Sequence, residues 1–215
     1  MTGRFPAVAT RFAAGVACAI LLASAGACTG GPQASPRPSP SPPPGQPTGA
    51  APTLHPRPAP LHVRVTRVHG TMSRHARTVL AHVAGRAVAT YFRNAFLGHY
   101  PRSDFHDAFA SFSAGAADKA RHDRDLLTNA GLGADTVAVV PRRQAAYLSV
   151  LAPHHAAVGI TANVHLDLLV DHSRSPDQKV TVKGRLLLTR RKSGGWQIFG
   201  YDLSRSAVAA KGGSR

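Results

Sequence analysis

The chain has 215 residues, of which 26 are Lys or Arg and only 10 are acidic, so its formal net charge is +16 at pH 7. That length allows one or two domains at most, and a hydrophobic share of 43% is enough to build a core. Both cysteines lie within the first 28 residues, which excludes a disulfide framework or a cysteine zinc site in the rest of the chain.

The first 27 residues have the layout of a secretory signal peptide. Arg4 and Arg11 precede an apolar stretch at residues 12–23, and small residues follow as far as Ala27. Residues 12–27 number 16, fewer than the ~20 residues that a membrane-spanning helix needs. We therefore expect this segment to be cleaved on export rather than kept as a membrane helix.

The four residues Ala25-Gly26-Ala27-Cys28 resemble a bacterial lipobox, in which small residues precede a cysteine that becomes the lipidated N-terminus. The family pattern usually begins with an aliphatic residue such as Leu, whereas here that position is Ala25. The resemblance implies a lipid on the sulfur of Cys28, and with it anchoring to the outer face of the cell membrane. The alternative is an ordinary signal peptide cut near Ala27, with Cys28 incidental.

Residues 28–60 follow as an anchor cysteine and a linker. Twelve of the 29 residues at 32–60 are Pro, mixed with Ser, Gly, Ala and Gln, with no periodic apolar pattern. Such a composition favours extended polyproline II, which would reach on the order of 100 Å at ~3.1 Å per residue. We expect a disordered spacer. The alternative is a Pro-rich ligand for an aromatic groove on a partner.

The folded part begins with a predicted strand and a long predicted helix. Residues 61–66 alternate between apolar and polar side chains, which is typical of a half-buried strand, here ending near Gly70. From Ser73 to Gly98 apolar residues recur every three or four positions. This spacing predicts an amphipathic helix of about six turns, capped by Ser73 and ended by Gly98.

Two further helices are predicted before the sheet. Ser103 is expected to cap a helix that buries an aromatic stripe, and Ser113 is expected to cap another over residues 114–129. The stripe consists of Phe105, Phe109 and Phe112.

From Asp135 onward the hydrophobic period changes to two, which is typical of strands. In the clearest segment, residues 158–170, nearly every second side chain is apolar and most of those between are polar. Consecutive strands joined by turns, with no helices between them, predict an antiparallel meander. The predicted strands cover residues 137–150, 158–171, 180–190 and 196–203, with a hairpin turn at 193–195.

Helices followed by a long antiparallel sheet predict an α+β domain at residues 61–205. We expect the helices to pack on one side of a curved sheet of four strands or more. Residues 206–215 are expected to form a disordered tail.

The last strand, with the sequence GGWQIFGYD at residues 194–202, completes a pattern that resembles the nuclear transport factor two-like superfamily. Members of that superfamily are α+β cones in which N-terminal helices pack into the hollow of a bent sheet. The resemblance covers about residues 73–205 and implies a cone-like domain, and the strand at residues 63–66 lies outside it. The chain is also similar to small actinobacterial envelope proteins that carry such a domain behind a lipid or membrane anchor.

Some members of that superfamily are isomerases or dehydratases that use an Asp or a His–Asp pair inside the cone. His165 and Asp167 are two apart on one predicted strand, so they share a face, and the carboxylate can orient the imidazole. Thr161, Asn163 and Asp171 share that face, which predicts that it faces solvent. A catalytic role would require this face to lie under the first helix. We therefore assign no catalytic residue, and His165 with Asp167 are the candidates for an alternative enzymatic function.

The sequence contains no motif for a metal or a cofactor. It has no Glu, so the usual base of zinc hydrolases is missing, along with one common ligand type. The histidines are scattered: His154 and His155 follow a Pro in an expected turn, and His75 and His82 share a helix face with Arg86. We expect no metal and no cofactor.

The excess of positive charge remains after the expected cleavage, because the first 27 residues contain two basic residues and no acid. Seven basic residues fall on adjoining predicted strands or at their ends and predict an anion-binding patch. An anionic envelope polymer, a lipid headgroup or an envelope protein would fit it, whereas nucleic acid is a poor partner for an exported protein. The alternative is compositional, since 21 Arg against 5 Lys is typical of GC-rich coding. The predicted patch consists of Arg142, Arg143, Lys183, Arg185, Arg190, Arg191 and Lys192.

These features predict an exported, lipid-anchored envelope protein whose folded domain binds a ligand or partner without catalysis. Two alternatives stay open. One is an isomerase, dehydratase or hydrolase that uses a pocket in the cone. The other is a passive scaffold that forms a homodimer through its sheet.

Overall fold

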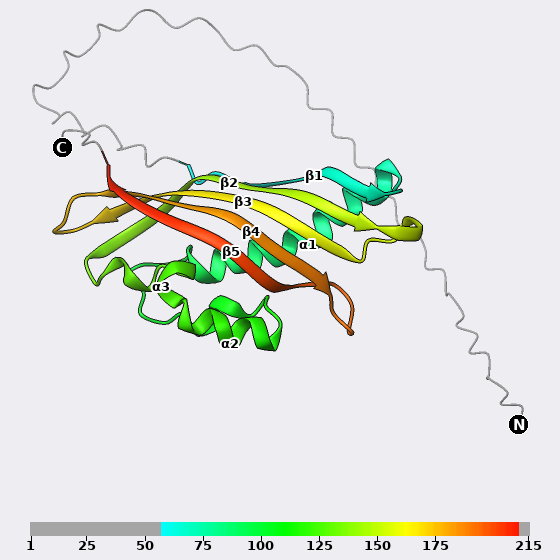
Figure 1. The fold of residues 1–215 in the computed structure, drawn as a ribbon. Coiled ribbons are helices and arrows are strands. Elements are labelled where there is room, and N and C mark those ends of the chain that lie inside the picture. The colour runs from blue at the N-terminus through cyan, green and yellow to red at the C-terminus, as the bar shows by residue number, and fades with distance from the viewer. Residues whose placement is uncertain (1–56, 211–215) are drawn as a thin grey trace, which may run out of the picture. The chain divides into compact units, whose positions relative to one another are not determined.

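The computed structural model describes residues 57–210 (Figure 1). The predicted signal peptide, the lipidation site Cys28, the linker up to residue 56 and the tail from residue 211 lie outside the described residues. The described part of the chain is an α+β domain, as predicted. No helix within it is long and apolar enough to cross a membrane.

The domain is built on one five-stranded sheet, in which the strands lie side by side in chain order. The strands are β1 (Leu61–Gly70), β2 (Thr136–Ala152), β3 (Gly159–His172), β4 (Gln178–Arg190) and β5 (Trp196–Ala209). β2 to β5 form the predicted antiparallel meander.

β1 pairs with β2 in parallel, with Leu61 opposite Gln144, so the sheet is mixed and the prediction of a purely antiparallel sheet is wrong at this edge. The chain between β1 and β2 is a long connection that contains the helices. Such a connection can return the chain to start β2 in the same direction as β1, which a tight hairpin cannot do.

The longest helix is α1 (Arg74–Ala95), which starts at its predicted cap. The Ser73 hydroxyl accepts a hydrogen bond from the amide of Ala76 at 3.1 Å. One face of α1 buries a stripe of residues against the sheet: Leu80, Ala84, Ala87, Val88, Tyr91, Phe92 and Ala95. Figure 1 shows α1 along one face of the sheet, with α2 and α3 on that same face.

The second predicted helix forms only a short 3-10 helix, η1 (His106–Phe109). Its aromatic stripe is nevertheless buried as predicted, at Phe105, Phe109 and Phe112. Phe112 packs edge to face with Phe109 and with Tyr91 of α1, at centroid distances of 5.3 Å and 5.1 Å. Aromatic packing therefore fixes this segment without a regular helix.

The third predicted helix divides at Asp123 into α2 (Ala114–His122) and α3 (Arg124–Leu127), and the 3-10 helix η2 (Ala130–Leu132) follows. Asp123 has φ −96° and ψ 24°, outside the helical range. Its carboxylate accepts a hydrogen bond from Tyr201 of β5. A contact with the sheet thus lies at the point where the helix breaks.

β5 is longer than the sequence predicts and ends at Ala209, which pairs with Gln178 at the start of β4. The prediction of a disordered tail from residue 206 is therefore wrong for residues 206–209. These residues are Ser, Ala, Val and Ala, which do not alternate between polar and apolar side chains, but the ladder with β4 continues through them.

The sheet has one covered face and one open face. Along β3 every second side chain is buried in the core with the helices: Ile160, Ala162, Val164, Leu166, Leu168 and Val170. The side chains between them are partly or fully exposed, so the predicted alternation is confirmed. We call the side that carries His165 and Asp167 the open face.

Candidate functional site

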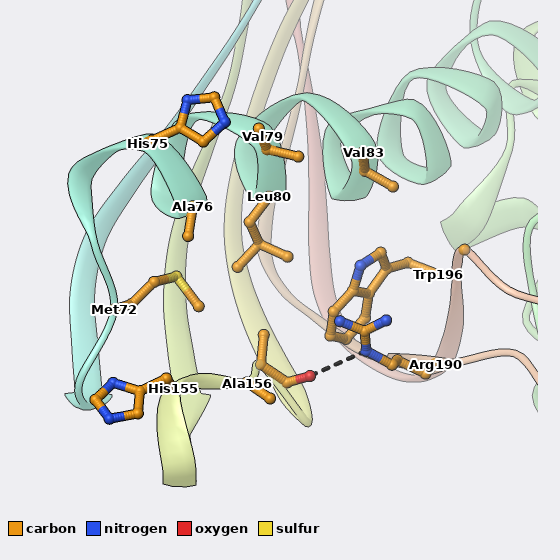
Figure 2. A pocket seen from close by; sticks show the side chains of 12 residues that line it. Met72, His75, Ala76, Val79, Leu80, Val83, His155, Ala156, Arg190 and Trp196 are labelled. Atoms are coloured by element: carbon orange, nitrogen blue, oxygen red, sulfur yellow. Dashed lines mark hydrogen bonds between the residues drawn. The ribbon is translucent and has the colours of Figure 1, made fainter.

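An apolar pocket opens between the first half of α1, the turn η3 (Pro153–His155) and the hairpin that joins β4 to β5 (Figure 2). Its volume is about 520 Å³, within the range of ~300–1,000 Å³ that is usual for small-molecule sites. α1 supplies one wall with the apolar side chains of Ala76, Val79, Leu80 and Val83. Val79 is 47% exposed, so apolar surface remains uncovered in this wall.

The opposite wall combines an aromatic ring with a cation. Arg190 ends β4 and Trp196 begins β5, and the guanidinium carbon lies 5.3 Å from the centroid of the indole ring. The Arg190 Nε donates a hydrogen bond to the carbonyl of Ala157 at 3.0 Å (Figure 2). The terminal N–H groups of this guanidinium make no hydrogen bond to the described residues. They remain as donors for an acidic group in the pocket.

Two histidines also line the pocket, His75 on α1 and His155 in η3. His154 and His155 have φ values of 51° and 65°, a left-handed conformation that is uncommon for residues with a Cβ. Both side chains are exposed, and the two residues lie in a turn, as expected. The sequence pattern did not reveal that this loop borders a pocket.

The candidate catalytic pair lies on the open face of the sheet. The His165 Nε2 is 3.1 Å from the Asp167 Oδ2, and the Thr181 hydroxyl of β4 donates to the Asp167 Oδ1 at 2.7 Å. Both side chains are partly covered, at 22% exposed for His165 and 16% for Asp167. The structure therefore brings the pair together, but away from α1 and from the apolar pocket.

The surroundings of Asp167 stabilise its charged form. Partial burial alone would raise the pKa of this carboxyl, but hydrogen bonds from Thr181 and His165 oppose that effect, as do the positive charges of His165 and Lys179. The balance lowers the pKa of Asp167 below its usual value. Asp167 is thus held as a carboxylate at neutral pH.

The predicted basic patch is not one surface. Arg142 and Arg143 of β2 line a groove on the open face together with Asp167 and Lys179, and its volume is about 850 Å³. Lys179 was not among the predicted patch residues, because its proximity depends on the registers between β2, β3 and β4. We call this surface the basic groove; its other lining residues are Leu168, Leu169, Val208, Ala209 and Ala210.

The other predicted patch residues have different surroundings. Lys183 and Arg185 share the open face farther along β4, where Arg185 forms an ion pair with Asp202 of β5 at 2.5 Å. Arg190 lines the apolar pocket, and Arg191 donates to the carbonyl of Ala110 at 3.2 Å. Lys192 is exposed in the hairpin.

A second His–Asp pair, which the sequence did not predict, lies where β2 begins and β3 ends, at the other end of the sheet from the apolar pocket. His172 is 3% exposed, and its Nδ1 lies 3.3 Å from the Asp135 Oδ1. The Ser175 hydroxyl donates to the Asp135 Oδ2 at 2.6 Å, and this bond is the main cause that lowers the pKa of Asp135. The pair connects the start of β2 to the turn between β3 and β4, which is a structural role.

Within residues 57–210, no three His, Cys or Asp side chains converge as a metal site requires. Compared with family models, with curated proteins and with solved structures, the chain matches none of them.

Proposed function

We propose that the domain is a non-catalytic binding module that takes an amphipathic acid, a ligand with an apolar body and one acidic group, in the pocket between α1 and the β4–β5 hairpin. The observation that carries this proposal is the presence of Arg190 in an otherwise largely apolar pocket. An apolar ligand body would cover Val79 and Leu80, and its acidic group would accept hydrogen bonds from the guanidinium.

The surroundings of Arg190 support a recognition role. Its guanidinium is fixed from two sides, by the Ala157 carbonyl and by the Trp196 ring. None of the ion pairs between described residues includes it. A fixed cation without a carboxylate partner loses little conformational freedom when it binds an anion.

Ligand binding in the pocket can be followed by intrinsic fluorescence, because Trp196 lines the pocket and is the only Trp in the chain. We expect dodecanoate to change the fluorescence of Trp196 saturably. Val79→Asp places a carboxylate in the apolar wall and should weaken dodecanoate binding by about tenfold or more, equivalent to about 1.4 kcal/mol. Val137→Asp is the matched control, since Val137 is similarly exposed at 49% but lies on β2 outside the pocket.

Arg190→Gln tests the role of the cation separately. It should reduce the affinity for dodecanoate to that for dodecanol, while dodecanol binding stays as in the wild type. A wild-type protein whose Trp196 fluorescence does not respond to either compound would contradict the proposed function.

The proposed location is the outer face of the cell membrane, through a lipid on Cys28. The charge layout of residues 1–27 and the small residues before Cys28 support it. We expect metabolic labelling with a fatty acid to mark the wild-type protein and not Cys28→Ala. Release of unlabelled wild-type protein into the medium would support the ordinary signal peptide instead.

We further propose that the domain is cone-like and related to the nuclear transport factor two-like superfamily. The α+β order, the four-stranded meander and the placement of the helices on one face support this relationship. An experimental structure would test it through the curvature of the sheet around α1.

A further inference from the structure

We infer that the basic groove on the open face is a second binding site, and that it takes a phosphate ester. This site is separate from the apolar pocket and does not depend on the proposed function or on the lipid anchor.

The first support is an irregularity in β2 that places two arginines in one groove. Successive side chains of a regular strand point to opposite faces. Between Pro141 and Arg143 the register with β3 shifts by one residue: Pro141 pairs with Leu168 and Arg143 with Asp167, which leaves Arg142 as the extra residue. Such a bulge redirects a side chain. Arg142 and Arg143 are both exposed and both line the groove.

The second support is the excess of positive charge in the groove. Arg142, Arg143 and Lys179 supply three cations, and no ion pair between described residues includes any of them. Asp167 is the only acid in the lining. Its Oδ1 accepts from Thr181 and its Oδ2 contacts His165, so both of its oxygens already have partners.

The third support concerns the class of anion. Two neighbouring guanidinium groups offer planar pairs of N–H donors that match the oxygens of a phosphate, and a lysine adds a compact charge. The groove also has an apolar side, with Leu169, Val208 and Ala209, and Val208 is 60% exposed. Cations beside an apolar surface fit a phosphate that is esterified to an apolar group.

Titration calorimetry at low ionic strength tests the proposal with two probes, inorganic phosphate and soluble dihexanoyl phosphatidylglycerol. Arg142→Gln with Arg143→Gln should weaken the binding of the responding probe by about tenfold or more. Lys183→Gln with Lys192→Gln is the matched control. This double variant removes the same amount of charge from exposed positions outside the groove. It should bind the responding probe with an affinity within about twofold of the wild type.

The two probes distinguish an esterified phosphate from a free one. Tighter binding of the lipid probe supports a phosphate esterified to an apolar group, whereas equal binding of both probes would show that the groove recognises free phosphate and would overturn the assignment to an ester. The inference is overturned if neither probe binds, or if the two double variants weaken binding equally, since the net charge alone would then explain the attraction. Circular dichroism and thermal unfolding of both double variants should match those of the wild type, which shows that they are folded.

Discussion

The hydroxyl of Tyr201 donates a hydrogen bond to the Oδ2 of Asp123 at 2.7 Å, and this contact joins β5 to the break between α2 and α3. Burial, and then the neighbouring carboxylate of Asp123, raise the pKa of Tyr201. The Lys119 ammonium lies 5.8 Å from the centroid of the same ring. Tyr201 therefore holds both short helices to the last strand.

Tyr201→Phe should lower the free energy of unfolding by about 1–2 kcal/mol, because it leaves the Asp123 carboxylate without its phenol donor while the ring packing remains. Urea unfolding measures the difference. Tyr147→Phe is the control, since Tyr147 is 40% exposed and its hydroxyl forms no hydrogen bond with the described residues. Equal stability of the two variants would argue against the contact.

Gly184→Ala should destabilise the protein by on the order of 3 kcal/mol. Gly184 in β4 has φ +138°, and a Cβ there would lie 2.1 Å from the Asp202 carbonyl oxygen, so both backbone strain and a clash follow. Gly159→Ala on β3 is the control, because nothing lies within 4 Å of its Cβ position. Thermal unfolding of the two variants compares them, and a Gly184→Ala protein as stable as Gly159→Ala contradicts the close approach of β5.

The lowered pKa of Asp167 predicts a pH dependence of stability. A carboxyl whose pKa is lower in the folded state stabilises the fold above its unfolded pKa of about 4, and this contribution is lost as the pH falls through the folded value. The difference in unfolding free energy between wild type and Asp167→Asn should therefore shrink between about pH 5 and pH 2. Thr181→Val, which removes a hydrogen bond to Asp167, should reduce the same pH dependence. If the difference in unfolding free energy between wild type and Asp167→Asn stays constant over this range, the pKa of Asp167 is not lowered by folding.

Asn129→Ala should cost about 1–3 kcal/mol, because its buried side chain amide donates to the Phe96 carbonyl at 2.8 Å and to the Tyr100 hydroxyl at 3.1 Å. These bonds hold the end of α1 to the segment before β2. Asn163→Ala on the open face is the control, since Asn163 is exposed and forms no hydrogen bond through its side chain within the described chain. Guanidinium unfolding should separate the two variants clearly.

Local patterns in the sequence predict the parts of this fold that depend on local geometry. The spacing around Leu80 and Val88 predicts α1, and the alternation from Ile160 to Val170 predicts β3 and its buried face. The residue period follows directly from the geometry of helix and strand, so these elements are visible without any tertiary information.

The parts that the sequence did not predict depend on contacts between distant segments. The break at Asp123 coincides with a bond to Tyr201, 78 positions away. The apolar pocket needs residues 72–83, 155–157 and 190–196 together. The basic groove needs the bulge at Arg142 and the position of Lys179 on another strand. No residue spacing within one element contains this information.

The parallel edge of the sheet has a consequence for the order in which the protein folds. β2 to β5 pair with their neighbours through short turns, whereas Leu61 of β1 pairs with Gln144, 83 positions later. Closing that long loop costs more chain entropy than closing a hairpin, so we expect β1 to dock last, although synthesis produces it first. Before β1 docks, Arg64 and Arg67 place two positive charges on the unpaired strand and discourage its pairing with other chains.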